Sequence, residues 1–305
     1  MIGQQLWRET DQLISLSENR KLLSYACECL NEPMPLGGDE TEDSDPQISS
    51  IRNVAFCLNG STIVEVGAGR GRILNAFRGF GDERLRSICY HAIEPNEDYR
   101  RELEEFAARE GLGSRFGLFS VAESIDPGLK YDLCILANVV REIPPDELHE
   151  FLNLYISAAK EGGKIAILEV TELAVGERDS VLFYPEAIEV IFESQGDAFE
   201  VDVANHKSHS GTGLFDLLIT VRNPSAILSA DDIVPGLDKV IGLECKALLR
   251  HRQDHNLSSL SFAFRSHNVA NAQIFGHLIR GIAGRRTGVH TLADESRCGR
   301  NPHRE

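Results

Sequence analysis

Hydrophobic positions in the middle of the chain follow two alternating patterns. Seven short runs rich in β-branched and aromatic residues predict strands, and between them apolar residues recur every three or four positions, which predicts helices. The expected strands cover 62–66, 87–93, 115–119, 131–137, 163–170, 199–204 and 214–221, and the expected helices cover 71–79, 97–110, 146–160 and 184–195. This alternation is typical of βαβ units. It predicts an α/β fold class with a doubly wound, mainly parallel sheet of seven strands.

The connection between the last two expected strands differs from the others. Residues 205–213, NHKSHSGTG, carry no helical pattern. Parallel neighbours would need a long crossover, whereas antiparallel neighbours need only a hairpin. The last strand is therefore expected to be antiparallel.

The N-terminal part of the chain carries a third pattern. Residues 6–30 have apolar positions at helical spacing, and the seven residues 39–45 contain five acids. A segment so acidic and so poor in apolar groups does not offset its ordering entropy. We expect residues 1–50 to form a helical segment that ends in a mobile acidic flap.

Beyond Pro224 the strand pattern stops and two helical stripes follow, which predict helices over 230–257 and 268–283. The stripes consist of Ile233, Leu237, Val240, Ile241, Leu248 and Leu249 in the first helix and of Val269, Ile274, Leu278 and Ile282 in the second. Two helices alone make a poor core, so we expect them to pack on the N-terminal helices, on the sheet or on a second copy of the chain in a homodimer. The expected domains are the N-terminal segment 1–50, a sheet domain 51–223, a helical addition 224–284 and a disordered polar tail 285–305.

Charge is distributed unevenly along the 305 residues. The chain has 31 Lys and Arg against 47 Asp and Glu, a net charge of −16, which disfavours non-specific binding to nucleic acid. Residues 246–305 are the exception, with ten Lys and Arg against four Asp and Glu. Nucleic acid could dock there, but few aromatic residues accompany these charges, and packing on the acidic remainder of the chain is the favoured interpretation.

Composition also bears on location. No run of 18 apolar residues predicts a membrane span, and the first residues lack the basic and apolar regions of a secretory signal. The seven cysteines include no CxxC pair, so we expect reduced thiols in a cytoplasmic protein without membrane partners.

The strongest local motif is TIVEVGAGRGRIL, residues 62–74, in which a strand leads through Gly67, Gly69 and Gly71 into a helix. Glycines permit positive φ and a close approach of the backbone to a ligand, and the amides at the helix start supply donors. The dinucleotide fingerprint GxGxxG would need a glycine where Arg72 stands. The pattern present is ExGxGxG, and a carboxylate at Glu65 suits a cationic amine better than a pyrophosphate.

A second acid ends the next expected strand. Glu94 lies 23 residues after Gly71. An acid about 20 residues beyond the glycines, at the carboxyl end of a strand, can accept hydrogen bonds from both hydroxyls of a ribose. Asn96 follows and is expected to cap the next helix.

These residues resemble motif I and the following acid of the class I S-adenosylmethionine (SAM) methyltransferases. The resemblance extends over residues 51–222. It implies SAM as cofactor, with Glu65 helping to bind the ammonium group and Glu94 binding both ribose hydroxyls. The cofactor-binding residues that it implies are Glu65, Gly67, Ala68, Gly69, Gly71, Glu94, Ala122, Glu123 and Asn138.

Two of these implied contacts depart from the family pattern. In SVAESI, residues 120–125, Ala122 and Glu123 match the family's adenine segment, but Val121 stands where an acid is common. After the fourth strand, Asn138 resembles the start of the Asn-Val-Leu-His-His-like string of members that act on small molecules. Arg141 and Glu142 replace the two histidines, so no catalytic role carries over from them.

The sulfonium of SAM already carries a good leaving group, so such an enzyme chiefly positions its reactants and needs no conspicuous catalytic dyad. The catalytic residue is therefore unassigned, and the candidates are Arg141, Glu142, Glu169, Glu172, His206 and His209. We expect no metal, because the pairs His206 and His209, and His251 and His255, lack companion ligands at recognisable spacing.

The function predicted is methyl transfer from SAM to an unidentified acceptor, with a small molecule favoured over protein or RNA. The Asn-Pro-Pro-Tyr string of DNA amino-methylating enzymes is absent from the sequence. Two alternatives stay open. One is a SAM-binding interaction module without catalysis, and the other is an NAD(P)-binding oxidoreductase, which Glu65 and Arg72 disfavour.

Overall fold

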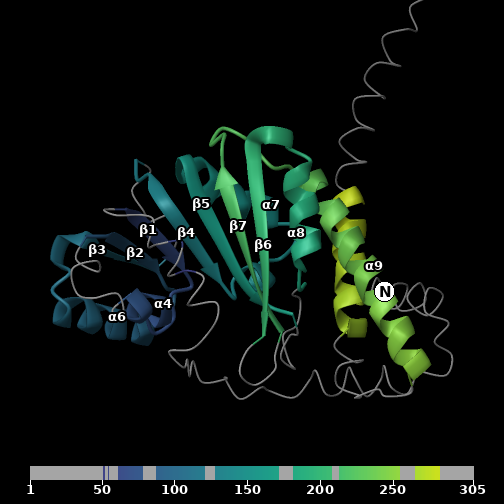
Figure 1. Ribbon diagram of the computed structural model, residues 1–305, viewed down its shortest axis with the longest axis horizontal. Coiled ribbons are helices and arrows are strands. Elements are labelled where there is room, and N and C mark those ends of the chain that lie inside the picture. Colours follow the sequence, from purple (N-terminus) through teal and green to yellow (C-terminus); the bar gives the residue numbers. More distant parts are fainter. Residues whose placement is uncertain are drawn as a thin grey trace, which may run out of the picture.

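One seven-stranded sheet organises the part of the chain that the structure, a computed structural model, describes (Figure 1). The described residues are 51, 54, 61–77, 87–120, 128–171, 181–207, 213–254 and 265–281. The strands are β1 (Thr62–Val66), β2 (Cys89–Ile93), β3 (Phe116–Phe119), β4 (Tyr131–Ala137), β5 (Ala159–Val170), β6 (Phe199–Lys207) and β7 (Gly213–Val221). Their order across the sheet is β3-β2-β1-β4-β5-β7-β6.

The direction of the strands confirms the predicted fold class. Strands β3, β2, β1, β4 and β5 pair in parallel, and β7 pairs with both β5 and β6 in antiparallel fashion. The expected antiparallel last strand is therefore confirmed, and it lies between β5 and β6. Glu65 stands opposite Ala92 of β2 and Ile135 of β4, so it lies between these two strands near their carboxyl ends.

Helices cover both faces of the sheet, because strand side chains point alternately to opposite sides. Ile63 of β1 packs in one hydrophobic core with α4 (Arg72–Phe77) and α6 (Glu97–Arg109). Val64 and Val66 belong to a second core with α7 (Leu148–Ala158) and α8 (Pro185–Glu193). The cap of α6 is confirmed, since Oδ1 of Asn96 accepts hydrogen bonds from the amides of Asp98 and Tyr99 at 2.9 and 3.3 Å.

Several predicted strand boundaries are wrong, and the largest difference is at the start of β5. Strand β5 begins at Ala159, four residues before the start predicted at 163. Tyr131 of β4 pairs with Ala159, whereas Leu133 pairs with Lys164, so β5 contains extra residues at this point. Gly162 has a φ of 77°, and this conformation lets the chain bulge without leaving the sheet.

The C-terminal helices lie on the sheet domain, which is one of the three surfaces expected for them. Helix α9 (Ala230–Asp254) packs against α8, and a second helix over 265–281 runs beside α9 (Figure 1). A Cβ at Gly236 of α9 would lie 2.7 Å from Cγ1 of Ile191, so the two helices approach closely. Leu249 and Leu278 were predicted to be buried in the stripes, but they are 51% and 41% exposed.

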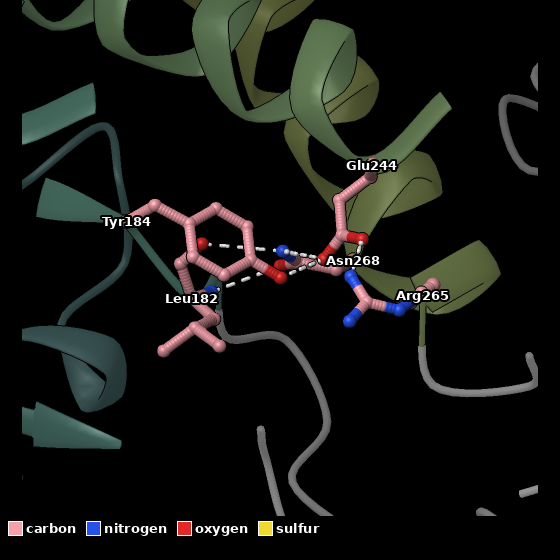
Figure 2. A network of polar contacts seen from close by, with 5 residues as sticks. All are labelled: Leu182, Tyr184, Glu244, Arg265 and Asn268. Carbon is pink, nitrogen blue, oxygen red and sulfur yellow. Dashed lines mark hydrogen bonds and ion pairs between the residues drawn. The ribbon is translucent and has the colours of Figure 1, made fainter. Parts of the chain in front are cut away.

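A buried polar network, shown in Figure 2, joins these helices to the segment that precedes α8. Glu244 of α9 is fully buried and forms an ion pair with Arg265 at 2.6 Å. It also accepts hydrogen bonds from the hydroxyl of Tyr184 and from Nδ2 of Asn268. Asn268 in turn bonds the backbone amide of Leu182 at 2.9 Å and its carbonyl at 3.2 Å. A buried polar contact, which the apolar stripes did not predict, therefore joins the two C-terminal helices to this segment.

The N-terminal segment 1–50 with its acidic flap and the tail 285–305 lie outside the described residues. Among the residues that are described, none of the helices combines the length and the apolar composition needed to cross a bilayer.

Candidate functional site

The loop after β1 has the backbone conformation that its glycines predict. Gly67, Gly69 and Gly71 have φ values of 66°, 54° and 83°, a region that other residues rarely adopt. The amides of Gly67 and Ala68 donate to the carbonyl oxygen of Ile93 at 2.9 and 3.2 Å. These two bonds hold the loop against the carboxyl end of β2.

Glu94 connects the end of β2 to this glycine loop. Its Oε2 accepts a hydrogen bond from the amide of Gly69 at 2.7 Å, and its Oε1 accepts one from the amide of Asn96 at 2.8 Å. The residue is 5% exposed. Because a carboxylate offers about four acceptor positions, these two bonds fix its orientation and leave capacity for the hydroxyls of a ligand.

Glu65, two residues before the loop, is 2% exposed. The hydroxyl of Tyr90 on β2 donates a hydrogen bond to its Oε2. Burial, followed by the charge of Glu65 and the hydrogen bond to it, raises the pKa of Tyr90 well above its ordinary value. The hydroxyl therefore stays protonated and remains a donor.

Sequence reasoning missed Tyr90, although the strand pattern contained a signal for it. In the parallel register, Tyr90 stands opposite Ile63 and Ala92 stands opposite Glu65. Side chains two positions apart on a strand share a face, so a tyrosine two residues before Ala92 faces the same side of the sheet as Glu65.

The loop after β4 closes the site on its other side. Asn138 has a φ of 59° and is the one non-glycine residue with a positive φ in the described parts of the chain. Its Oδ1 accepts a hydrogen bond from Nη1 of Arg141 at 3.1 Å. A Cβ at Gly67 would lie only 2.8 Å from the side chain of Val139, so this loop packs directly on the glycine loop.

An ion pair joins the loop after β4 to β5. Nη1 of Arg141 lies 3.3 Å from Oε2 of Glu169, which is 1% exposed at the end of β5. The backbone amide of Arg141 also donates to Oε1 of Glu169, at 3.4 Å. Arg141 and Glu169 were separate candidates in the sequence, and the structure assigns them to one contact that holds Asn138 in place.

Glu142 is the last residue of the short turn Val140–Glu142, and it is exposed to solvent. The pKa of its carboxyl is raised, chiefly because the group is partly removed from water, while the charge of Arg141 lowers it and that of Glu94 raises it.

The carboxyl ends of these strands thus carry four acids, Glu65, Glu94, Glu142 and Glu169, beside the cation Arg141. Such a set favours a cationic ligand with hydroxyl groups and disfavours a pyrophosphate. SAM carries a sulfonium, an ammonium and a ribose diol, so the residues present fit this cofactor. The structure brings together Glu65, the glycine loop, Glu94 and Asn138.

The remaining sequence candidates are not placed by the structure. Ala122, Glu123, Glu172, His209 and His255 lie outside the described residues, as do the side chains of His206 and His251. Within the described parts of the chain, no group of three His, Cys, Asp or Glu side chains could hold a metal ion.

Neither a known family model nor a curated protein matches this chain. Several solved structures are similar to it. The N-methyltransferase NodS from Bradyrhizobium japonicum WM9, in complex with S-adenosyl-L-homocysteine, is 12% identical with a TM-score of 0.47, over 66% of this chain and 99% of that one. The 1,6-didemethyltoxoflavin-N1-methyltransferase from Burkholderia thailandensis, with bound S-adenosylhomocysteine, is 15% identical with a TM-score of 0.45, over 66% of this chain and 88% of that one.

A tRNA methyltransferase from M. jannaschii is also similar, at 18% identity and a TM-score of 0.40. The match covers 58% of this chain and 48% of that one, so this chain spans about half the length of that enzyme. The mainly parallel sheet of this chain and its antiparallel β7 are those that the sequence pattern predicted. The chain thus has the Rossmann-like fold expected of class I methyltransferases.

Proposed function

We propose that this protein is a SAM-dependent methyltransferase. The observation that carries the proposal is the convergence of Glu94 on the glycine loop, where its carboxylate bonds the amide of Gly69, next to the buried carboxylate of Glu65. A loop with three left-handed glycines and two acids at its borders provides separate partners for the ribose and for the ammonium of one ligand.

In this proposal, different residues of the site bind different parts of the cofactor. Glu94 binds the ribose hydroxyls, Glu65 binds the ammonium group, and the backbone from Gly67 to Gly71 lies along the amino-acid end. Ala122 and Glu123 are proposed to contact adenine. Asn138, fixed by Arg141 and by its bond to the carbonyl of Leu168 at 2.8 Å, borders the acceptor.

Bound SAM supplies an electrophilic methyl group with its leaving group, so the chain has to bind, orient and exclude water. The acceptor proposed is a small molecule, which rests on the resemblance of the Asn138 loop to members that act on small molecules. Glu142 is the acid that we propose to take a proton from an acceptor, because it lies in the turn that follows the Asn138 loop and the pKa of its carboxyl is raised.

RNA is the less favoured acceptor. Two arginines of the basic C-terminal region are paired within the chain, Arg265 with the buried Glu244 at 2.6 Å and Arg280 with Asp238 at 2.5 Å. Charges neutralised in this way contribute less to a phosphate-binding surface. A SAM-binding module without catalysis would share the cofactor site, and a methyl-transfer assay separates that function from the one proposed.

The test of the cofactor site is calorimetric titration of Glu94→Ala with S-adenosylhomocysteine. The loss of the ribose contacts should weaken binding by about 1–3 kcal/mol, which is about five- to 150-fold in the dissociation constant. Asn96→Ala is the matched control, since it removes the cap of α6 and about 1 kcal/mol of stability but leaves the carboxylate in place. An unchanged dissociation constant in Glu94→Ala would remove this residue from the ribose site.

A further inference from the structure

Three carboxylates of the described residues are at most 2% exposed, and they have different kinds of partner. Glu169 has the guanidinium of Arg141 at 3.3 Å, and Glu244 has that of Arg265 at 2.6 Å. Glu65 accepts a hydrogen bond from the phenol of Tyr90. A phenol hydroxyl orients the carboxylate to which it donates.

The ring of Tyr90 is held independently of its hydroxyl. It is fully buried, lies edge-on to Phe77 of α4 at 6.1 Å and stacks on Phe116 of β3 at 6.5 Å with an interplanar angle of 12°. These contacts come from a helix on one side and a neighbouring strand on the other. They aim the hydroxyl at Glu65 and would remain in a phenylalanine.

We propose that Tyr90 is a positioning residue for the cofactor, which orients the carboxylate of Glu65 toward the ammonium group of SAM. This inference rests on the proposed function, because the ammonium belongs to the cofactor proposed there. Tyr90 does not touch the cofactor and acts through Glu65 alone.

The test compares two ligands that differ in the group at issue. S-adenosylhomocysteine carries the ammonium, whereas 5′-methylthioadenosine has the same adenosine and thioether without the amino-acid part. Tyr90→Phe should weaken S-adenosylhomocysteine about tenfold, the effect of losing a hydrogen bond to a charged group. Its dissociation constant for 5′-methylthioadenosine should change less than about twofold, because Glu65 has no partner in that ligand. Calorimetric titration gives both constants.

A double-mutant cycle with Glu65→Gln tests whether the two residues act together. Glu65→Gln should weaken S-adenosylhomocysteine at least about tenfold and leave 5′-methylthioadenosine unchanged. If Tyr90 acts through Glu65, adding Tyr90→Phe to Glu65→Gln should cause little further loss, less than about threefold. If the losses of affinity in the two single variants multiply in the double variant, the two residues act independently, and this would contradict the proposal.

Tyr131→Phe is the matched control. Tyr131 is a tyrosine of the neighbouring strand β4, is 1% exposed, and donates its hydroxyl hydrogen bond to the carbonyl oxygen of Tyr155 at 2.5 Å. Its removal should lower the melting temperature and leave the ratio of the two dissociation constants as in the wild type.

The outcomes separate this inference from the function on which it rests. If the wild type binds neither ligand, the proposed function fails and the role of Tyr90 falls with it. If the wild type binds both, and Tyr90→Phe weakens both equally or neither, then only the role of Tyr90 is overturned. A selective loss of S-adenosylhomocysteine, absent in Tyr131→Phe, supports it.

Discussion

Single residues of the loop after β1 have backbone conformations that would allow a ligand to lie against the loop. Gly69 has a φ of 54°, and its amide donates to the carboxylate of Glu94 at 2.7 Å. A side chain at this position would carry the strain of a left-handed conformation and, in the proposed site, would also meet the cofactor. The two effects can be separated, because Gly111 has a similar φ of 66° with open space around it.

The residue-scale prediction compares Gly69→Val with Gly111→Val. Both variants should lose about 1–2 kcal/mol of stability, because a β-branched residue is strained at positive φ. Only Gly69→Val should lose the binding of S-adenosylhomocysteine. Thermal unfolding and calorimetric titration measure the two effects, and a Gly69→Val variant that binds the ligand as tightly as the wild type would show that the loop is merely a turn.

A comparison of the predicted and observed strands shows which structural features follow from the local sequence pattern. Strands β1 and β4 have the predicted bounds, and the loop glycines have the predicted positive φ, because apolar periodicity and glycine conformation are local properties of a chain. The start of β5 was missed because its bulge depends on the register with β4. Local signals therefore predicted the sheet and its glycine loop, while register came only from the fold.

Contacts between distant residues could not be read from the sequence in the same way. The carboxylate of Glu169 and the side chain of Arg141 are 28 residues apart, and Tyr184 and Glu244 are 60 apart. No spacing rule connects such pairs, since only the packed sheet and helices bring them together. Tyr90 belongs to this group too, although its shared face with Glu65 was available once β1 and β2 were paired.

Helix α9 and the helix over 265–281 are joined by two ion pairs of contrasting burial. Glu244 and Arg265 lie in the interior with side chains 0% and 19% exposed, whereas Asp238 and Arg280 are 53% and 48% exposed. Removal of the Glu244 carboxylate takes one partner each from a buried arginine, a tyrosine hydroxyl and an amide (Figure 2). The same removal at the surface leaves groups that water can solvate.

At the element scale we therefore predict unequal effects of Glu244→Ala and Asp238→Ala. Breaking the buried pair should lower the free energy of unfolding by about 3–5 kcal/mol. Breaking the exposed pair should lower it by less than about 1 kcal/mol. Urea denaturation of both variants measures the difference, and equal losses would contradict the view that the network anchors the C-terminal helices to the segment before α8.

For the whole molecule, the C-terminal helices share one core with the sheet. Ile233, Leu237 and Val240 are fully buried in the same cluster as Leu217 and Ile219 of β7. Burial of each such side chain stabilises a protein by about 1.5–3 kcal/mol, and a whole domain is stable by only about 5–15 kcal/mol. We therefore expect that the sheet domain does not remain folded without these helices.

Truncation after Arg222 should accordingly give an aggregated protein, whereas truncation after Gly284 should give a soluble one that binds S-adenosylhomocysteine. Expression and size-exclusion chromatography of the two proteins measure this. The opposing view is an autonomous RNA-binding domain at the C-terminus. A soluble, ligand-binding fragment 1–222, together with salt-sensitive RNA binding by the isolated C-terminal fragment, would support that view and contradict ours.

Calorimetric titration of the full chain with S-adenosylhomocysteine and, separately, with NADH tests the central claim most directly. The two ligands share an adenosine, and they differ in the groups that Glu65 and the glycine loop would meet, an ammonium in one and a pyrophosphate in the other. With the acids Glu65 and Glu94 beside the loop, we predict saturable binding of S-adenosylhomocysteine and none of NADH. Binding of NADH with no response to S-adenosylhomocysteine would contradict the account.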